Sequence, residues 1–414
     1  MAIRARAVDA FTVAAVSFCL SGEARVGAQE PERAGEARQA REEKARELTP
    51  HRRSAIERGL FKLEDGLLLE RLLSPPKGVH LRLGGIGEGA GFGVGPAYRA
   101  NTPRYDFKTS AAVSMKKYGI AEASLRFPGT LGHNGYIRAD GPYAQIDGRY
   151  RDFPQEDFFG LGPDSDVRSR SNYALKDTLG KGTGGYQRGL FNTGVSVGYL
   201  DVSVGAGEDR RMPSADALFD PSTLPGFGAE PQYFLTEQFI EFATRDRAIN
   251  RRAGGEYRVT AAHYQDRQGD RASFRRWEAD LRQFITFEKD TRSIALRAFA
   301  ASVTPTQGGE VPYYLQPTLG GAQTLRGYRS FRFRDRSALL LQAEYRWRIN
   351  AFVQGALFYD TGAVAARLKD LGGLERDYGF GLRAGGRMGS AFRFDVAFGG
   401  REGRRYLLRF DDAF

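Results

Sequence analysis

Residues 392–398 read Phe-Arg-Phe-Asp-Val-Ala-Phe, so apolar side chains occupy every second position. A period of two is that of a β-strand with one apolar face, because successive side chains of a strand point to opposite sides. Residues 338–349 and 273–287 show the same alternation. The C-terminal half of the chain is therefore predicted to consist of β-strands.

The two faces of these strands differ in their chemistry. In 338–349 one face carries leucine, tyrosine and tryptophan, and the other carries Gln342, Glu344, Arg346 and Arg348. A soluble sandwich turns its apolar faces toward each other, whereas a barrel in a bilayer turns them toward lipid and places charge in its lumen. Alternation alone leaves both architectures open, and the two ends of the chain favour the barrel.

Residues 1–28 have the features of a secretory signal peptide. A basic start precedes an apolar run, and Val26-Gly27-Ala28 offers small residues for cleavage before Gln29. A disordered N-terminal tail is the alternative interpretation. The single cysteine, Cys19, would be removed with the signal peptide, so the mature chain is expected to have no disulfide and no thiol chemistry.

Residues 29–78 differ from the rest of the chain. They are rich in charged residues and alanine, and leucines recur at helical spacing until Pro75-Pro76. We expect a helical periplasmic segment at 29–78, followed by an outer-membrane β-barrel at 79–414.

The chain also ends as outer-membrane barrels commonly end, on an aromatic residue. Four apolar side chains are predicted to share one face of the last strand and to form a C-terminal assembly signal: Tyr406, Leu408, Phe410 and Phe414. Assembly machinery can read such a strand by strand addition. The predicted location is the Gram-negative outer membrane, with the C-terminus in the periplasm.

The composition agrees with a barrel and argues against other classes. The mean hydropathy is −0.46, and no stretch of about 18 apolar residues exists to form a transmembrane helix. Fifty-two glycines and 12% aromatic residues suit many strands with tight turns rather than disorder. The net charge of +11 could suggest nucleic-acid binding, but the arginines are interleaved with acidic residues, so none is expected.

About sixteen strands are predicted, an even number as single-chain bacterial barrels require. If the C-terminus is periplasmic, the links at 288–290, 350–352 and 388–390 are periplasmic and short, whereas those at 152–170, 206–234 and 304–337 are external and long. The predicted strands are 79–87, 91–99, 107–116, 119–127, 142–151, 171–178, 193–205, 235–245, 255–266, 273–287, 291–303, 338–349, 353–363, 378–387, 391–399 and 404–413.

The long link at 304–337 contains Leu325-Arg326-Gly327-Tyr328, and the strands after it carry Glu344 and Phe358-Tyr359-Asp360-Thr361-Gly362. These motifs resemble those of the BamA/TamA outer-membrane insertase and two-partner-secretion superfamily, including its bacterial surface antigen type. The resemblance is strongest over 316–414. It implies that this link is the sixth external loop and that it folds back into the barrel.

The charges of the motifs suggest how such a loop is held. Alternation places Glu344 and Asp360 on lumen faces of neighbouring strands, where two carboxylates repel unless a cation lies between them. Arg326 can offer a planar fork of donors to both. Gly327 is expected to allow a sharp turn, Tyr328 to pack against the lumen lining, and Gly362 belongs to the same loop-pinning motif.

The resemblance implies a barrel that assists the insertion or translocation of proteins, or of lipids, at the outer membrane. The expected partners are membrane lipid and lipopolysaccharide, a substrate polypeptide, and the barrel assembly machinery. Members that insert or export proteins usually carry POTRA modules, for which 29–78 is too short, so the chain resembles a POTRA-less member. The alternative is a passive pore or a structural surface protein that has lost translocase activity.

The remaining candidate motifs predict no metal, nucleotide or catalytic site. The four histidines, His51, His80, His133 and His263, lack metal-ligand spacing, so no metal site is expected. The glycine-rich runs 84–91 and 180–185 lack the strand–helix setting of a phosphate loop. No nucleophile motif adjoins the histidines, and neither an enzyme nor a cofactor is predicted.

Overall fold

The computed structural model describes residues 77–410 except 130–139, 221, 223, 245–252, 270, 289–290, 307, 351–352 and 387–388; for 385, 386, 389–391 and 401 it describes the backbone only. The chain divides into two compact units, Met1–Lys62 and Leu63–Phe414, and every described residue lies in the second. The predicted signal peptide, almost all of the predicted helical segment, and Phe414 lie outside the described residues.

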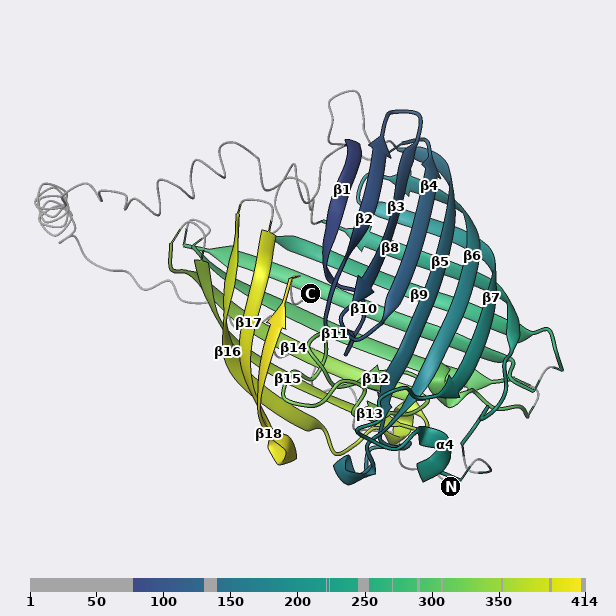
Figure 1. The fold of residues 1–414 in the computed structure, drawn as a ribbon. Coiled ribbons are helices and arrows are strands. Elements are labelled where there is room, and N and C mark those ends of the chain that lie inside the picture. Colours follow the sequence, from purple (N-terminus) through teal and green to yellow (C-terminus); the bar gives the residue numbers. More distant parts are fainter. Residues whose placement is uncertain are drawn as a thin grey trace, which may run out of the picture. The chain divides into compact units, whose positions relative to one another are not determined.

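Sixteen strands form one antiparallel sheet in chain order (Figure 1). The predicted all-β architecture and strand number are confirmed. The strands are β1 (Lys77–Gly85), β2 (Phe92–Asn101), β3 (Asp106–Ser114), β4 (Gly119–Phe127), β5 (Gly141–Phe158), β6 (Ser171–Arg188), β7 (Phe191–Ala206), β8 (Gln232–Ala243), β9 (Gly254–Asp266), β10 (Phe274–Phe287), β11 (Arg292–Pro305), β14 (Ser337–Arg348), β15 (Val353–Ala365), β16 (Glu375–Gly386), β17 (Gly389–Gly399) and β18 (Gly403–Arg409).

Two strands are much longer than predicted. β5 and β6 have 18 residues each, and their pairing runs from Gly141↔Gln187 to Phe158↔Ser171. The glycines of 180–185, which interrupt the alternation in the sequence, lie inside β6 and pair with β7. Backbone hydrogen bonding to two neighbours maintains a strand where the side-chain pattern is too weak to reveal it. The first strand also starts earlier than predicted, at Lys77 rather than residue 79.

The links between strands differ strongly in length at the two ends of the barrel. Because consecutive strands are antiparallel, the two longest links, 207–231 and 306–336, lie at one end, here called the loop end, together with 159–170 and 366–374. The helix α4 (Ala215–Leu218) and the two-stranded sheet of β12 (Thr318–Leu319) and β13 (Phe333–Arg334) belong to these links. The link that contains Arg326 is the sixth at this end, as the sequence predicted.

Apolar and charged side chains are distributed opposite to their places in a soluble protein. Leu357, Phe380 and Leu382 are about half exposed on the outside of the sheet, whereas Glu344 and Asp395 are completely buried inside. A barrel surrounded by lipid has this arrangement. Among the described residues, no helix is long and apolar enough to cross a membrane.

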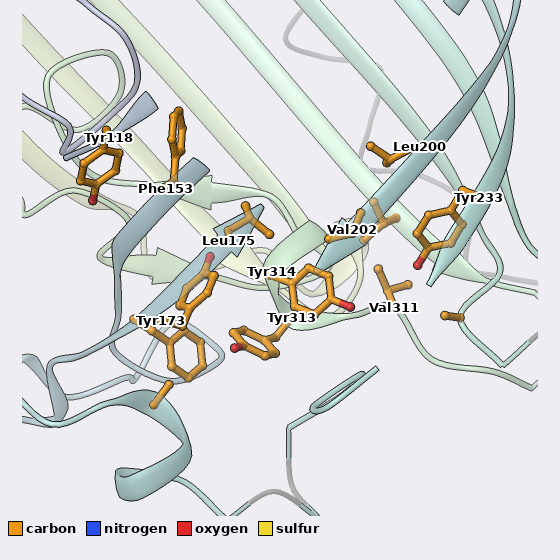
Figure 2. Close-up of a cluster of buried hydrophobic side chains, with 14 of the residues drawn as sticks. Tyr118, Phe153, Tyr173, Leu175, Leu200, Val202, Tyr233, Val311, Tyr313 and Tyr314 are labelled. Carbon is orange, nitrogen blue, oxygen red and sulfur yellow. The ribbon is translucent and has the colours of Figure 1, made fainter. Parts of the chain in front are cut away.

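A cluster of aromatic side chains lies inside the barrel near the loop end. Figure 2 shows Tyr173, Tyr313 and Tyr314 gathered together, and Tyr118 and Phe153 next to each other in another part of the same cluster. The ring centroids of Tyr173 and Tyr313 are 5.2 Å apart, and those of Tyr313 and Tyr314 are also 5.2 Å apart. The cluster joins side chains of β5, β6 and the sixth loop, so it fixes the loop to the N-terminal half of the barrel.

The first and last strands meet through side chains. Within residues 77–410, no backbone ladder joins β1 to β18. The ring centroids of Phe92 and Phe410 lie 4.6 Å apart, and Arg409 Nη1 lies 3.9 Å from Glu88 Oε2. We call this junction the seam.

Candidate functional site

The sixth loop enters the barrel as two paired segments that end in a short tip. The pairs Thr318↔Arg334 and Leu319↔Phe333 hold its two limbs together, so residues 320–332 form a closed tip. Gly320 and Gly321 have φ values of +111° and +101°, which side chains other than glycine rarely adopt. The tip is compact because the N–H of Gly321 donates to the carbonyls of Leu325 and Tyr328, each at 3.1 Å.

Arg326 extends from this tip to the carboxylates of two adjacent strands. Its Nε and Nη2 donate to the two oxygens of Asp360 at 2.6 and 2.7 Å, and its Nη1 donates to Glu344 Oε2 at 2.5 Å. All three side chains are 0% exposed. The guanidinium also lies 3.6 Å from the ring centroid of Phe358. The structure thus brings together the three charged residues that the sequence proposed for one site.

The ion pairs of Arg326 with Asp360 and Glu344, here called the clasp, are part of a larger charge network that was not predicted from the sequence. Arg383 Nη2 donates to Glu344 at 2.9 Å, and its Nη1 donates to Asp395. Arg393 Nε lies 3.3 Å from Asp395, and its Nη2 donates to the carbonyl of Ala322 in the loop tip. Arg393 and Asp395 form the polar face of Phe392–Phe398 in the sequence, but without the strand register they cannot be connected with the loop.

The network stabilises the loop only while it remains complete. Burial lowers the pKa of Arg326, but the charges of Asp360 and Glu344 and the bonds to Asp360 outweigh this effect and raise it above its usual value. The guanidinium is therefore a permanent cation. A buried ion pair that loses one partner leaves an uncompensated charge, which costs about 3–5 kcal/mol.

Gly327 lies in a tight turn, as expected, and also packs closely against another strand. The N–H of Tyr328 donates to the carbonyl of Leu325 at 3.1 Å, so Arg326 and Gly327 are the central residues of a β-turn, although Gly327 does not adopt a positive φ. An added Cβ would overlap the Cα of Gly399 and lie 2.6 Å from Asp377 Cβ. Gly327 is required because the loop backbone packs directly against the end of β17.

Tyr328 and Gly362 complete the predicted motif. Tyr328 is buried, and its hydroxyl lies 2.7 Å from Glu375 Oε2 and 3.2 Å from the carbonyl of Arg376. A Cβ on Gly362 would lie 2.6 Å from the carbonyl oxygen of Leu339, so β15 can lie close to β14 there only with glycine. Both residues bring the loop and the C-terminal strands into close contact.

The segment of the loop that follows the tip is held by residues for which no role was predicted from the sequence. Arg334 Nη1 donates to the carbonyl of Tyr313 at 2.8 Å, and Nη2 donates to Tyr173 Oη at 3.0 Å. The N–H of Gly162 donates to the carbonyl of Arg334 at 2.8 Å. The segment Phe158–Gly162 therefore contacts the sixth loop.

The C-terminal residues lie apart from this network. Tyr406, Leu408 and Phe410 are exposed on the outside of the last strand, on one face as expected. Their use as an assembly signal remains a prediction. Within the described ranges, no group of three or more His, Cys, Asp or Glu side chains is placed to hold a metal ion.

Comparison with known proteins agrees with this geometry. Residues 228–409, which contain the sixth loop and both carboxylates of the clasp, match the Omp85 superfamily domain. The fold is similar to BamA from Haemophilus ducreyi lacking POTRA domains 1–3, with 14% identity, a TM-score of 0.56, and coverage of 80% of this chain and 69% of that chain. It is also similar to CdiB from Escherichia coli, with 12% identity, a TM-score of 0.51, and coverage of 84% and 70%.

No curated protein matches the chain. Because the identities to the solved structures are low, these structures establish the fold alone. The domain match covers the residues that form the clasp. Residues 228–409 therefore carry an Omp85 superfamily domain, within a β-barrel whose fold is similar to those of BamA and CdiB.

Proposed function

We propose that this barrel assists proteins in inserting into the outer membrane or in crossing it, with the Arg326 loop as a fixed internal element. One observation carries the proposal: a loop clasped by buried charges lies beside a seam that has no backbone ladder within residues 77–410. The Omp85 domain match over 228–409 and the similarity of the fold to BamA and CdiB support it.

The arrangement of lumen and seam favours a route through the wall. The loop tip and the aromatic cluster occupy the lumen near the loop end. The seam, by contrast, is held by a few side-chain contacts, which separate at a lower free-energy cost than a ladder of hydrogen bonds. Strand edges carry backbone N–H and C=O groups that can pair with another strand, so the seam suits a β-structured substrate.

The orientation and partners follow from the same proposal. The long loops face outward, and the short turns and the C-terminus face the periplasm, as in most outer-membrane barrels. The outer apolar face contacts lipid, with lipopolysaccharide on the loop side. The substrate is an unfolded polypeptide, and the barrel assembly machinery inserts the chain itself. Lipid transport would use the same seam, but no described side chain favours it over protein transport.

A direct test is to fold the purified chain into liposomes and measure how fast a second, unrelated barrel folds into them. Folding is followed by the gel mobility shift and protease resistance of the substrate. The control liposomes have the same lipids and contain an equal amount of a barrel that lacks an internal loop. We expect faster folding only with this chain, and equal rates in both preparations would refute the insertase proposal.

The alternative, a passive pore, has less support because charged and aromatic side chains fill the lumen beside the loop. Planar-bilayer recordings separate the two functions. A passive pore would give steady, large currents that do not depend on Arg326. The proposed function predicts small or intermittent currents from the unaltered chain.

A further inference from the structure

Glu88 lies in the turn between β1 and β2 and contacts both the sixth loop and the last strand. Its Oε1 accepts hydrogen bonds from Ser330 Oγ at 2.7 Å and from the N–H of Ala322 at 3.3 Å. Its Oε2 lies 3.9 Å from Nη1 of Arg409 in β18. One carboxylate therefore contacts the loop tip and, across the seam, the strand on the other side.

Two glycines make room for these contacts. A Cβ on Gly321 of the loop would overlap Glu88 Oε1, and a Cβ on Gly85 would lie 3.0 Å from Nη2 of Arg409. With larger residues at these positions, the Glu88 carboxylate would have to move, and the Arg409 guanidinium would have to shift by a few tenths of an ångström. The loop and the first hairpin are thus shaped around this pair.

The same loop is also held from the opposite side of the seam. Glu402, in the turn between β17 and β18, accepts hydrogen bonds from the N–H of Arg329 at 3.1 Å and from Arg332 Nε at 2.5 Å. Ser330 and Arg329 are adjacent in the chain, so consecutive loop residues bind carboxylates of the first and of the last hairpin. The loop tip therefore spans the seam from inside.

The two attachments differ in strength. On the side of the last strands, the tip is also fixed by the buried Arg326 clasp and by Tyr328 on Glu375. On the side of the first hairpin, Glu88 accepts both of the described hydrogen bonds between the turn and the sixth loop. If the seam separates, the loop is expected to stay with the C-terminal strands and to release Glu88.

We infer that Glu88 is a latch that couples the seam to the internal loop. The inference rests on the proposed function, because the seam is the route which that function requires. While Glu88 holds Ser330, Ala322 and Arg409, the first hairpin stays beside the last strand. Loss of these contacts frees the hairpin to move without breaking the Arg326 clasp, so seam opening and loop attachment are separate events.

The test measures the width of the seam directly. Val79 in β1 and Tyr406 in β18 are 79% and 62% exposed on the outer surface, so both positions tolerate spin labels. The labels are attached to V79C/Y406C in a C19S background, and pulsed electron paramagnetic resonance gives the distance distribution in liposomes. The variants are E88A, E88Q and the matched control E237A, since Glu237 forms a lumen ion pair with Lys181 at 3.3 Å on β6 and β8, away from the seam.

We expect one narrow distribution for the parent and E237A, and a shift to longer, broader distances for E88A. E88Q should lie between them, because its amide oxygen still accepts from Ser330 but no longer attracts Arg409. Heat-modifiable gel mobility shows which variants are folded. If E88A does not fold, S330A removes one donor to Glu88 and should shift the distribution in the same direction by a smaller amount.

A distribution for folded E88A, or for S330A in its place, that superimposes on the parent would overturn the latch. The measurement needs no substrate, so its outcome is independent of the insertion assay. A wider seam in E88A together with no acceleration of substrate folding would leave the latch intact and remove the proposed function. An unchanged distance distribution in E88A together with accelerated substrate folding would support the proposed function and refute the latch.

Discussion

Arg326 and Asp360 face each other through two nearly parallel hydrogen bonds of 2.6 and 2.7 Å, although they are 34 residues apart in the chain. A bidentate pair of this kind fixes both the position and the orientation of the guanidinium. The orientation matters because the remaining Nη1 then points at Glu344 on the neighbouring strand. The sixth loop is thereby attached to β14 and β15 at a single defined depth in the lumen.

Replacing Arg326 should destabilise the barrel strongly. Arg326→Ala leaves Asp360 and Glu344 without their shared cation, and we expect a loss of about 3–5 kcal/mol in the free energy of unfolding. Urea titration in detergent micelles measures this loss. Arg211→Ala is the control, because the Arg211 side chain is 80% exposed where it pairs with Asp209, and such a pair should contribute only about 0–1 kcal/mol. Equal stability of R326A and the parent would contradict the clasp.

Lysine should not substitute for this arginine. Arg326→Lys keeps the positive charge but loses the planar fork that reaches Asp360 and Glu344 together. We expect the loop to remain inside the barrel but to be cleaved faster by protease, with a rate between those of the parent and R326A. Limited proteolysis followed by mass spectrometry locates the cut. Cleavage as slow as in the parent would mean that charge alone holds the loop.

Gly327→Ala should displace the loop tip even though alanine adds only one methyl group. The new Cβ would overlap the backbone of Gly399, so either the loop or the end of β17 must move. We expect faster proteolysis within 320–332 and lower stability. Gly372→Ala is the matched control, since nothing lies within 4 Å of its added Cβ. The same proteolysis rate in both variants would argue against close backbone packing.

Tyr328→Phe tests the hydroxyl contact with Glu375 while preserving the ring. Loss of a hydrogen bond to a charged group is expected to cost about 1.5–3 kcal/mol, measured by the same urea titration. Tyr406→Phe removes a hydroxyl from the exposed outer face and should leave stability unchanged. A Y328F variant as stable as Y406F would show that the ring, not the hydroxyl, holds this part of the loop.

Release of the loop should also change the conductance of the barrel. With Arg326→Ala, the tip is no longer fixed in the lumen, and we expect larger and more frequent single-channel currents than for the parent. Planar-bilayer recordings at equal protein incorporation check this, with Arg211→Ala recorded in parallel. Identical current histograms for R326A and the parent would indicate that the loop does not limit ion flow.

The sequence alone determined which segments become strands and which face of each strand meets lipid, because alternation is a local property of consecutive residues. The motif around Arg326 also predicted its two carboxylate partners, since Glu344 and Asp360 lie at lumen positions of successive strands. Local pattern failed at β6, where glycines hide the alternation and the pairing with β5 and β7 maintains the strand.

Only the tertiary structure decided which charges meet across the lumen and the seam. Arg393, Asp395 and Glu402 join the loop because strand register and barrel closure bring β17 and its turn to the tip. Glu88 joins it from the other end of the chain, 242 residues before Ser330. Contacts between such distant segments depend on the shape of the closed sheet, which no local pattern of side chains specifies.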